Sequence, residues 1–131
     1  MRLAPSEIES LIAAARAACG NAYAPYSGFS VGAACLTGSG RIFSGANVEN
    51  ASYGLSNCAE RSAVFNAIGA GERNIRAIAI YTPTHRPVSP CGACRQVISE
   101  FGEAIEIVAC AEDGTIRRWT AAELLPERFQ L

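Results

Sequence analysis

This sequence has no excess of charge of either sign. It contains 11 basic and 12 acidic residues among 131, which gives a net charge of −1 at pH 7. The basic residues are spread along the chain and form no stripe that could hold a phosphate backbone. The sequence also lacks any apolar run that approaches the ~20 residues of a membrane span. We therefore expect neither a nucleic acid nor a membrane as a partner.

A recognisable export signal is missing as well. The N-terminal segment carries Glu7, Glu9 and Arg16 where the core of a signal peptide would be apolar, so we expect a cytoplasmic protein. Half of the residues are hydrophobic, 18% are charged, and Pro and Gly do not dominate, which argues against disorder. The length fits one compact domain that spans residues 1–131.

Disulfide bonds are not expected either, although the chain has six cysteines. Disulfide scaffolds are small secreted chains, so reduced thiols are the better interpretation of a chain without an export signal. Cys19, Cys35 and Cys110 fall in apolar helix or strand patterns, where a cysteine acts as a small apolar residue. Three cysteines remain to be explained, namely Cys58, Cys91 and Cys94.

Apolar periodicity and turn residues predict alternating helices and strands. In chain order they are a helix over 6–19, a hairpin of strands over 29–37 and 41–48, a helix over 58–67, a strand over 75–81, a helix over 91–101, strands over 105–110 and 116–119, and a last helical turn after residue 120. The pairs Ser6 with Glu9 and Thr120 with Glu123 predict capping boxes at the first and last helices.

The order α-β-β-α-β-α-β-β-α predicts an α/β fold, in which a sheet carries helices on its faces. The strand over 75–81 is a near-continuous apolar run of the kind buried on both faces, so we expect it at the centre of the sheet. The helices that begin at Cys58 and Cys91 both follow strands. In open α/β sheets the working crevice lies outside the carboxyl ends of strands, so we expect both helix starts to lie there.

Cys91 and Cys94 have the CxxC spacing, which lets both thiols of a first helical turn point toward one ion. Taken alone, the pair also fits a redox pair of the thioredoxin type or two unrelated core cysteines. Cys58 favours the metal, because three thiolates form a zinc site that lacks a fourth protein ligand. An open fourth position is typical of catalytic rather than structural zinc.

Glu60 lies two residues after Cys58, where it can face such a site without binding the metal and can carry protons. The alternative is a carboxylate that only favours the positive end of a helix dipole. Three thiolates and Zn²⁺ carry a net negative charge, which requires a positive group nearby. Arg61 and Arg95 are candidates, and a solvated surface position is the alternative for either one.

The sequence closely resembles the small, homotetrameric, zinc-dependent cytidine deaminases, in the segments "CAERSA", "SPCGACRQVISEF", "NVENASYG" and "PYSGFSVGAA". The match runs from about residue 5 to the C-terminal "ELLPERF". The resemblance implies a three-layer α/β/α fold with a mixed five-stranded sheet, and one Zn²⁺ per chain. It implies the hydrolysis of free cytidine and deoxycytidine to uridine, deoxyuridine and ammonia, in pyrimidine salvage. It also implies a homotetramer whose sites are completed by neighbouring subunits.

The same resemblance implies roles for residues near the predicted metal. Cys58, Cys91 and Cys94 match the zinc ligands of the family, and Glu60 matches the glutamate that shuttles protons. Arg61 matches an arginine that neutralises charge at the site.

Substrate contacts are implied in the same way. Phe29 matches an aromatic residue packed against the nucleoside, and Asn47 with Glu49 matches the pair that holds the ribose 3′-hydroxyl. Ala59 is a further implied substrate contact. Ser89 stands where the backbone carbonyl of the family meets the departing ammonia.

Two aromatic positions have less definite roles. Phe129 matches a C-terminal aromatic residue that reaches the site of a neighbouring subunit, with simple packing as the alternative. The lone histidine, His85, falls in a loop, where we expect a surface residue. Polynucleotide-editing relatives carry HxE where this chain carries CxE, which again favours a free nucleoside as the substrate.

Two other functions stay open at this point. One is the deamination of a cytosine-containing antibiotic such as blasticidin, which uses the same CxE and PCxxC residues, although the intact "NVENASYG" argues against it. The other is a non-catalytic zinc-binding module with a closed site. The open coordination position and Glu60 argue against that module.

Overall fold

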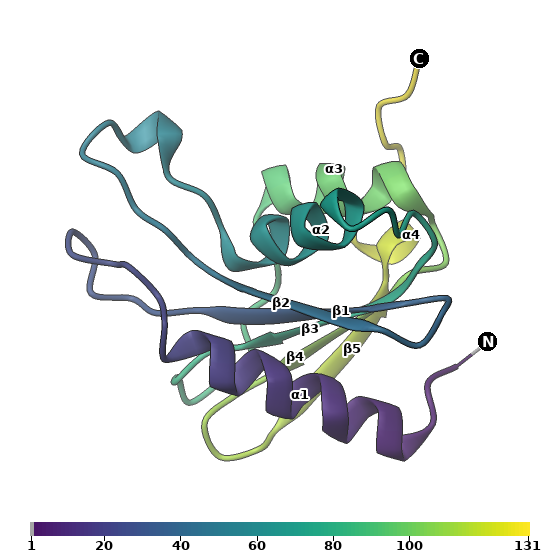
Figure 1. Cartoon of the computed structure of the whole chain (residues 1–131), viewed down its shortest axis with the longest axis horizontal. Coiled ribbons are helices and arrows are strands. Elements are labelled where there is room, and N and C mark those ends of the chain that lie inside the picture. The colour runs from purple at the N-terminus through teal and green to yellow at the C-terminus, as the bar shows by residue number, and fades with distance from the viewer. Residues whose placement is uncertain (1) are drawn as a thin grey trace.

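The computed structural model describes residues 2–131 as a five-stranded β-sheet between helices (Figure 1). The elements follow the predicted order, with one short 3₁₀ helix added in the loop before the second α-helix. In chain order they are α1 (Pro5–Cys19), β1 (Gly32–Thr37), β2 (Ile42–Ala46), η1 (Tyr53–Leu55), α2 (Ala59–Gly69), β3 (Ile75–Tyr81), α3 (Gly92–Phe101), β4 (Glu106–Cys110), β5 (Ile116–Thr120) and α4 (Ala121–Leu124).

The strands lie in the order β2-β1-β3-β4-β5. The β3–β4 pair is parallel and the other three pairs are antiparallel, so the sheet is mixed. β3 occupies the centre, and all of its residues except Arg76 are buried, as its apolar run predicts. The predicted α/β fold, with a mixed five-stranded sheet and helices on both faces, is confirmed.

The helices form two layers around the sheet (Figure 1). α1 covers one face, and α2, α3 and α4 cover the other. Successive residues of β3 enter two separate cores, because neighbouring side chains of a strand point to opposite faces. Ile78 and Ile80 pack in the core beneath α2 and α3, whereas Ala77 and Ala79 pack with the fully buried Leu11 of α1. No helix within residues 2–131 combines the length and the apolar character that a membrane crossing requires.

The three cysteines that we expected to be packing residues are buried. Cys35 lies in the core beneath α2 and α3, and Cys19 and Cys110 lie in the core beneath α1. Burial raises the pKa of the Cys35 thiol to about 12, so this thiol stays protonated at neutral pH. Every cysteine within residues 2–131 is free, in agreement with the predicted reduced state.

The capping box predicted for the last helix is confirmed. The backbone N–H of Thr120 donates to Oε1 of Glu123 at 2.8 Å, and the backbone N–H of Glu123 donates to Oγ1 of Thr120 at 3.2 Å. Each side chain thus satisfies a backbone group that the short helix leaves free.

The capping box predicted for the first helix, Ser6 with Glu9, is wrong. α1 begins at Pro5, one residue earlier than the predicted cap, because a fixed φ and a missing N–H suit proline to a first helical position. The backbone N–H of Ala4 donates to Oε1 of Glu7 at 2.9 Å, so Glu7 takes the part predicted for Glu9.

A close contact between β2 and α2 requires glycine at position 45. A Cβ atom on Gly45 would lie 2.6 Å from the backbone N of Ala63 and 2.7 Å from Cβ of Ser62. Neither atom can move unless α2 shifts. Gly45→Ala should therefore lower the free energy of unfolding by about 1–3 kcal/mol, the usual range for overpacking. Urea denaturation followed by circular dichroism measures this change.

Gly69→Ala is the matched control, because Gly69 belongs to α2 and a Cβ atom there would meet nothing within 4 Å. This variant should keep or slightly raise the stability, since alanine restricts the unfolded chain. Equal stability of the two variants would contradict the tight contact at Gly45.

Candidate active site

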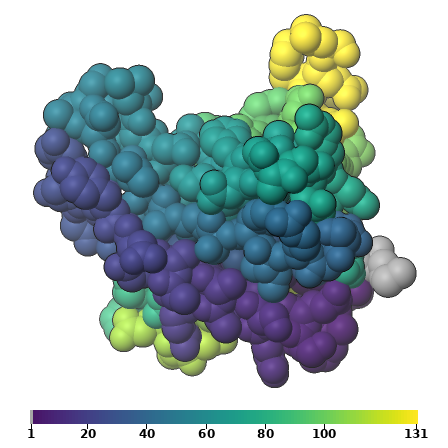
Figure 2. Space-filling view, viewed as in Figure 1, coloured from purple at the N-terminus to yellow at the C-terminus, as the bar shows by residue number. Residues whose placement is uncertain are grey.

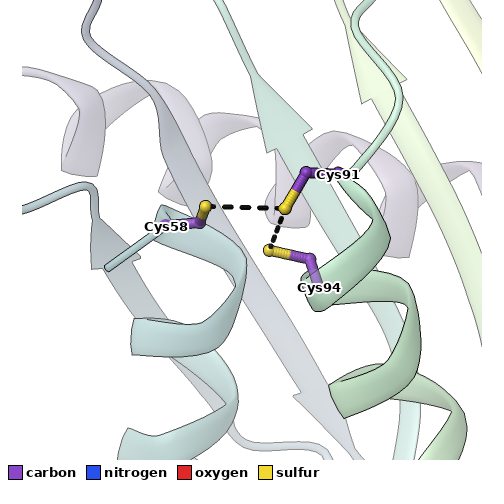
Figure 3. Close-up of side chains that lie close together, drawn as sticks. All are labelled: Cys58, Cys91 and Cys94. Atoms are coloured by element: carbon purple, nitrogen blue, oxygen red, sulfur yellow. Dashed lines mark hydrogen bonds between the residues drawn. The ribbon is translucent and has the colours of Figure 1, made fainter. Parts of the chain in front are cut away.

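Three cysteine sulfurs from two helix N-termini come together at one point (Figure 3). Cys58 is the N-cap residue of α2, Cys91 is the N-cap residue of α3, and Cys94 lies in the first turn of α3. The Sγ atoms of Cys58 and Cys91 are 3.8 Å apart, and those of Cys91 and Cys94 are 3.5 Å apart. All three sulfurs lie within 4.8 Å of one another.

These spacings fit a zinc ion. Four ligands at a Zn–S distance of about 2.3 Å in a tetrahedron place neighbouring sulfurs about 3.8 Å apart. Thiolates are soft donors, which suit zinc better than magnesium or calcium. Three protein ligands are one fewer than a structural zinc site uses, so the donor set matches the open type of site.

The local backbone explains why the sulfurs meet at helix ends. Cys58 and Cys91 are extended, with ψ angles of 155° and 169°, as is usual for residues that precede a helix. The buried Pro90 comes directly before Cys91. The free N–H groups of a first helical turn and the helix dipole both favour a thiolate over a thiol. The two helix starts therefore stabilise the charge that a metal ligand needs.

Arg61 supplies positive charge beside the sulfurs. Its Nη2 atom donates a hydrogen bond to Sγ of Cys58 at 3.2 Å. The pKa of Cys58 falls to about 5, first because the Cys94 thiol donates to its sulfur and then because Arg61 does. The same shared proton, together with burial, raises the pKa of Cys94. The surroundings of Cys58 therefore favour its thiolate over its thiol.

A cavity of about 410 Å³ opens beside the sulfurs. It is lined by the metal-site residues Cys58 and Cys91, by Glu60 and Arg61, and by five of the six predicted substrate contacts, which are Phe29, Asn47, Glu49, Ala59 and Ser89. The structure thus brings residues from four separate stretches of the sequence to one cavity.

Glu60 is buried at this cavity and is only 5% exposed. Burial raises the pKa of its carboxyl above the usual range, and the negative charge on Cys58 raises it further. A general acid–base group works best when its pKa lies near the working pH. The surroundings of Glu60 therefore favour a group that both accepts and returns protons.

The Asn47 side chain forms hydrogen bonds to the part of the cavity wall that contains Phe29. Its Nδ2 donates to the backbone carbonyl of Phe29 at 2.8 Å, and its Oδ1 accepts from the backbone N–H of Val31 at 2.8 Å. The strand predicted to start at residue 29 begins only at Gly32, because residues 29–31 bond to this side chain as a loop.

The Glu49 side chain forms hydrogen bonds to the preceding residues of the same loop. Its Oε1 accepts from the backbone N–H groups of Tyr26 and Ser27 at 2.9 and 3.1 Å, and the Ser27 hydroxyl donates to Oε2. The Ser27 hydroxyl and backbone hold the pKa of this carboxyl below its usual range, so Glu49 stays ionised. Asn47 and Glu49 of the NVEN segment thus shape the loop over residues 26–31.

The hydrogen bonds of Arg95 differ from the predicted role at the sulfurs. Its guanidinium donates to the backbone carbonyls of Pro90 and Leu124 at 2.8 and 3.1 Å, and to Oγ of Ser89 at 3.1 Å. All three acceptors are oxygen atoms. Of the two candidate arginines, only Arg61 bonds to a ligand sulfur within residues 2–131.

Two remaining predicted positions lie away from the cavity. Phe129 is 69% exposed, and its backbone carbonyl accepts from Nε2 of Gln96 at 3.2 Å. His85 is exposed in the loop between β3 and α3, as expected for a surface residue.

Several residues that line the cavity have no role predicted from the sequence. Ile80 and Thr82 stand at the carboxyl end of the central strand, where ligands of open α/β sheets bind, so their position could have predicted them. Ser27 and Val88 also line it, but they lie in loops without periodicity, and no local pattern distinguishes them.

Comparison with known proteins agrees with this geometry. Residues 5–118 match the family described as the cytidine and deoxycytidylate deaminase zinc-binding region. The chain belongs to this family. Similar curated proteins include a cytidine deaminase from Sporosarcina psychrophila, 47% identical over 124 residues that cover 94% of this chain and 91% of the relative. Another, from Halalkalibacterium halodurans, is 53% identical over 109 residues that cover 82% of this chain and 83% of the relative.

Solved structures of the deaminase family share the fold. A cytidine deaminase from Burkholderia pseudomallei is similar with a TM-score of 0.90 and 53% identity, covering 92% of this chain and 98% of that one. A cytidine deaminase from Mycobacterium tuberculosis gives a TM-score of 0.83 and 39% identity, covering 95% and 98%. The predicted family and fold are confirmed. The matched zinc-binding region contains all three clustered cysteines, so zinc is the cofactor of this deaminase.

Removal of any one clustered sulfur should release the metal, because zinc then keeps only two protein ligands. Metal analysis should find about one zinc per wild-type chain, and far less in Cys58→Ala, Cys91→Ala and Cys94→Ala. Cys19→Ala and Cys35→Ala are controls that should keep their zinc, since both side chains lie in the cores. Equal zinc loss in all five variants would show that the cysteines have been divided wrongly.

Arg61→Ala should make zinc easier to release by acid. Loss of the donor raises the pKa of Cys58 from its lowered value, so protons compete with zinc at a higher pH. The pH midpoint of zinc release, followed with a coloured chelator, should therefore move upward. Arg117→Ala is the control, because that guanidinium lies over the Trp119 ring on β5. An unmoved midpoint in Arg61→Ala would contradict the role of Arg61.

Proposed function

We propose that this chain catalyses the hydrolytic deamination of free cytidine and deoxycytidine, which gives uridine or deoxyuridine and ammonia. The observation that carries the proposal is one cavity that joins a three-sulfur metal site to a buried carboxyl, Glu60. Relatives that are named cytidine deaminase, at 47% and 53% identity, support the same reaction. The reaction belongs to pyrimidine salvage, because it converts one free nucleoside into another.

Cys58, Cys91 and Cys94 would hold the zinc ion, each as a thiolate. When bound there, zinc supplies a Lewis acid that makes water acidic enough to lose a proton near neutral pH. Arg61 bonds to Cys58 and offsets the net negative charge that three thiolates bring. The positive charge thus favours the loss of that proton.

Glu60 moves the protons of the reaction, in the role that zinc deaminases share. Its carboxylate takes a proton from the attacking water and delivers it to ring nitrogen N3 as the new C4–O bond forms. It then carries the proton of the new C4 hydroxyl to the amino group, so that the C–N bond breaks, ammonia leaves and the C4 carbonyl of the product forms. The burial that raises the pKa of Glu60 suits it to both directions of transfer.

Five further residues orient the nucleoside, and all of them line the cavity. Phe29 presents an aromatic ring to the substrate, and Ala59 leaves room beside Glu60. Asn47 and Glu49 meet the ribose 3′-hydroxyl, for which the ionised carboxylate of Glu49 is an acceptor. The backbone carbonyl of Ser89 meets the departing ammonia.

We further propose a homotetramer in which neighbouring subunits complete the sites. The loops before β1 and around η1 project from one end of the molecule (Figure 2). They expose large apolar side chains, which are Tyr23, Tyr26, Val48, Tyr53 and Leu55. Exposed apolar patches mark protein contacts. Phe129 is exposed outside the cavity of its own chain and would reach the site of a neighbouring subunit. Light scattering would measure the mass of the assembly.

No nucleic acid is part of the proposed function, and the proposed location is the cytoplasm. The net charge of −1 offers little attraction to a phosphate backbone. The site needs three reduced thiols, and a reducing compartment keeps them in that state.

Ammonia release from cytidine by the zinc-loaded protein tests the proposed function. We expect one uridine and one ammonia for each cytidine consumed, measured by chromatography and a coupled ammonia assay. Turnover of blasticidin without turnover of cytidine would replace the proposed substrate with an antibiotic. Absence of ammonia with both compounds would leave a non-catalytic zinc-binding module.

Glu60→Gln should abolish most of the activity but keep the metal. Glutamine preserves the size of the side chain and loses only the group that accepts and returns protons. We expect kcat to fall by at least ~10²–10⁴-fold, as for a positioned acid or base. Zinc content and cytidine binding should stay close to wild type, since Glu60 is not a ligand. Loss of zinc, or near-normal turnover, would contradict the role of Glu60.

A further inference from the structure

Arg95 makes more hydrogen bonds at the cavity wall than a charge-balancing role requires. It follows Cys94 directly, in the first turns of α3, yet its guanidinium bonds to no sulfur among residues 2–131. Nε donates to the carbonyl of Pro90 at 2.8 Å, Nη2 donates to Oγ of Ser89 at 3.1 Å, and Nη1 donates to the carbonyl of Leu124 at 3.1 Å. All three nitrogens of the guanidinium thus donate hydrogen bonds to oxygen atoms.

The acceptors belong to two segments that are far apart in the sequence. Ser89 lines the cavity, and Pro90 precedes the ligand Cys91. Leu124 ends α4, which packs against α3. Within residues 2–131, the hydrogen bonds formed by the Ser89 hydroxyl and the Pro90 carbonyl both come from Arg95. Proline has no N–H, so this segment has few other ways to be fixed.

We propose that Arg95 is a positioning residue, which fixes the Ser89–Pro90 wall at the reacting end of the substrate. It acts through the shape of its guanidinium and not through its charge. The inference rests on the proposed function, in which Ser89 meets the departing ammonia. A shift of this wall changes the contact made at the breaking C–N bond and leaves the contacts at the sugar in place.

Substitution of Arg95 by lysine separates the effect of the guanidinium's shape from the effect of its charge. A guanidinium presents donors in a rigid planar fork, whereas the ammonium of lysine is a compact point charge on a flexible stem. Lysine at position 95 keeps the positive charge but cannot reach three oxygens that lie in three directions. If Arg95 only balances charge, Arg95→Lys keeps the activity. If Arg95 positions the wall, Arg95→Lys loses it.

The experiment compares Arg95→Lys, Arg95→Ala and Arg117→Ala, each as zinc-loaded full-length protein with cytidine as substrate. We expect kcat/KM to fall ~10²-fold in both Arg95 variants, mainly through kcat, as misplacement of a positioned group does. Zinc content and the pH midpoint of kcat should not change. Arg117→Ala should match wild type. Recovery of activity in Arg95→Lys, or a shifted pH midpoint, would overturn the proposal.

A second measurement needs no activity. Hydrogen–deuterium exchange of peptides that cover residues 83–96 should be several-fold faster in both Arg95 variants than in Arg117→Ala, because the wall loses its hydrogen bonds. Unchanged exchange would overturn the positioning role even if the variants were inactive. A wild-type protein that does not deaminate cytidine would instead refute the proposed function, and the exchange result would still decide the role of Arg95.

Discussion

The meeting of two helix N-termini at one end of the sheet is the constraint on which the site depends. Three sulfurs must lie within 4.8 Å of one another, although Cys58 begins one helix and Cys91 and Cys94 belong to another. Each helix N-terminus carries partial positive charge, so two of them can hold three negative sulfurs that would otherwise repel each other. Gly45 contributes at a distance, because it lets α2 lie close against β2. A displacement of either helix by about one ångström would change the geometry of the whole metal centre.

Parts of the cavity wall are loops, and side chains there take the place of regular backbone pairing. Asn47 and Glu49 bond to backbone groups between Tyr26 and Val31, and Arg95 bonds to the Ser89–Pro90 segment. Irregular backbone has unpaired N–H and C=O groups that need partners. These polar side chains therefore shape the pocket even where they also face it.

Much of the fold could be predicted from the sequence, because its signals are local. The apolar run of β3 and the Thr120 cap depend on neighbours within a few residues, and the structure agrees with both. The predicted start of α1 was wrong because Pro5 suits the first helical position, which makes Ala4 and not Ser6 the N-cap residue. The pairing of Cys91 with Cys94 was predictable from CxxC, because residues three apart face one another on a helix. The approach of Cys58 was expected because both helices begin after strands, at the carboxyl ends of the sheet.

The partners of polar side chains could not be predicted in the same way. Arg95 follows a ligand cysteine just as Arg61 follows Glu60, so the sequence offers both as neutralising charges. Their different partners arise from the packing of α4 and the Ser89–Pro90 segment against α3, which brings carbonyl groups to Arg95 alone. Such contacts join residues up to 29 positions apart, beyond the reach of any local pattern.

The strand order also affects the order in which the protein folds and binds its metal. The β1–β2 and β4–β5 pairs are hairpins, but the central pairs join residue 35 to 78 and residue 78 to 107. Long chain closures of this kind form slowly compared with hairpins. α2 and α3 lie within these two closures, so their N-termini meet only after the central strands have paired. We therefore expect zinc to bind to a nearly complete fold and not to start folding. Zinc supply then limits only the last step in the folding of each new chain.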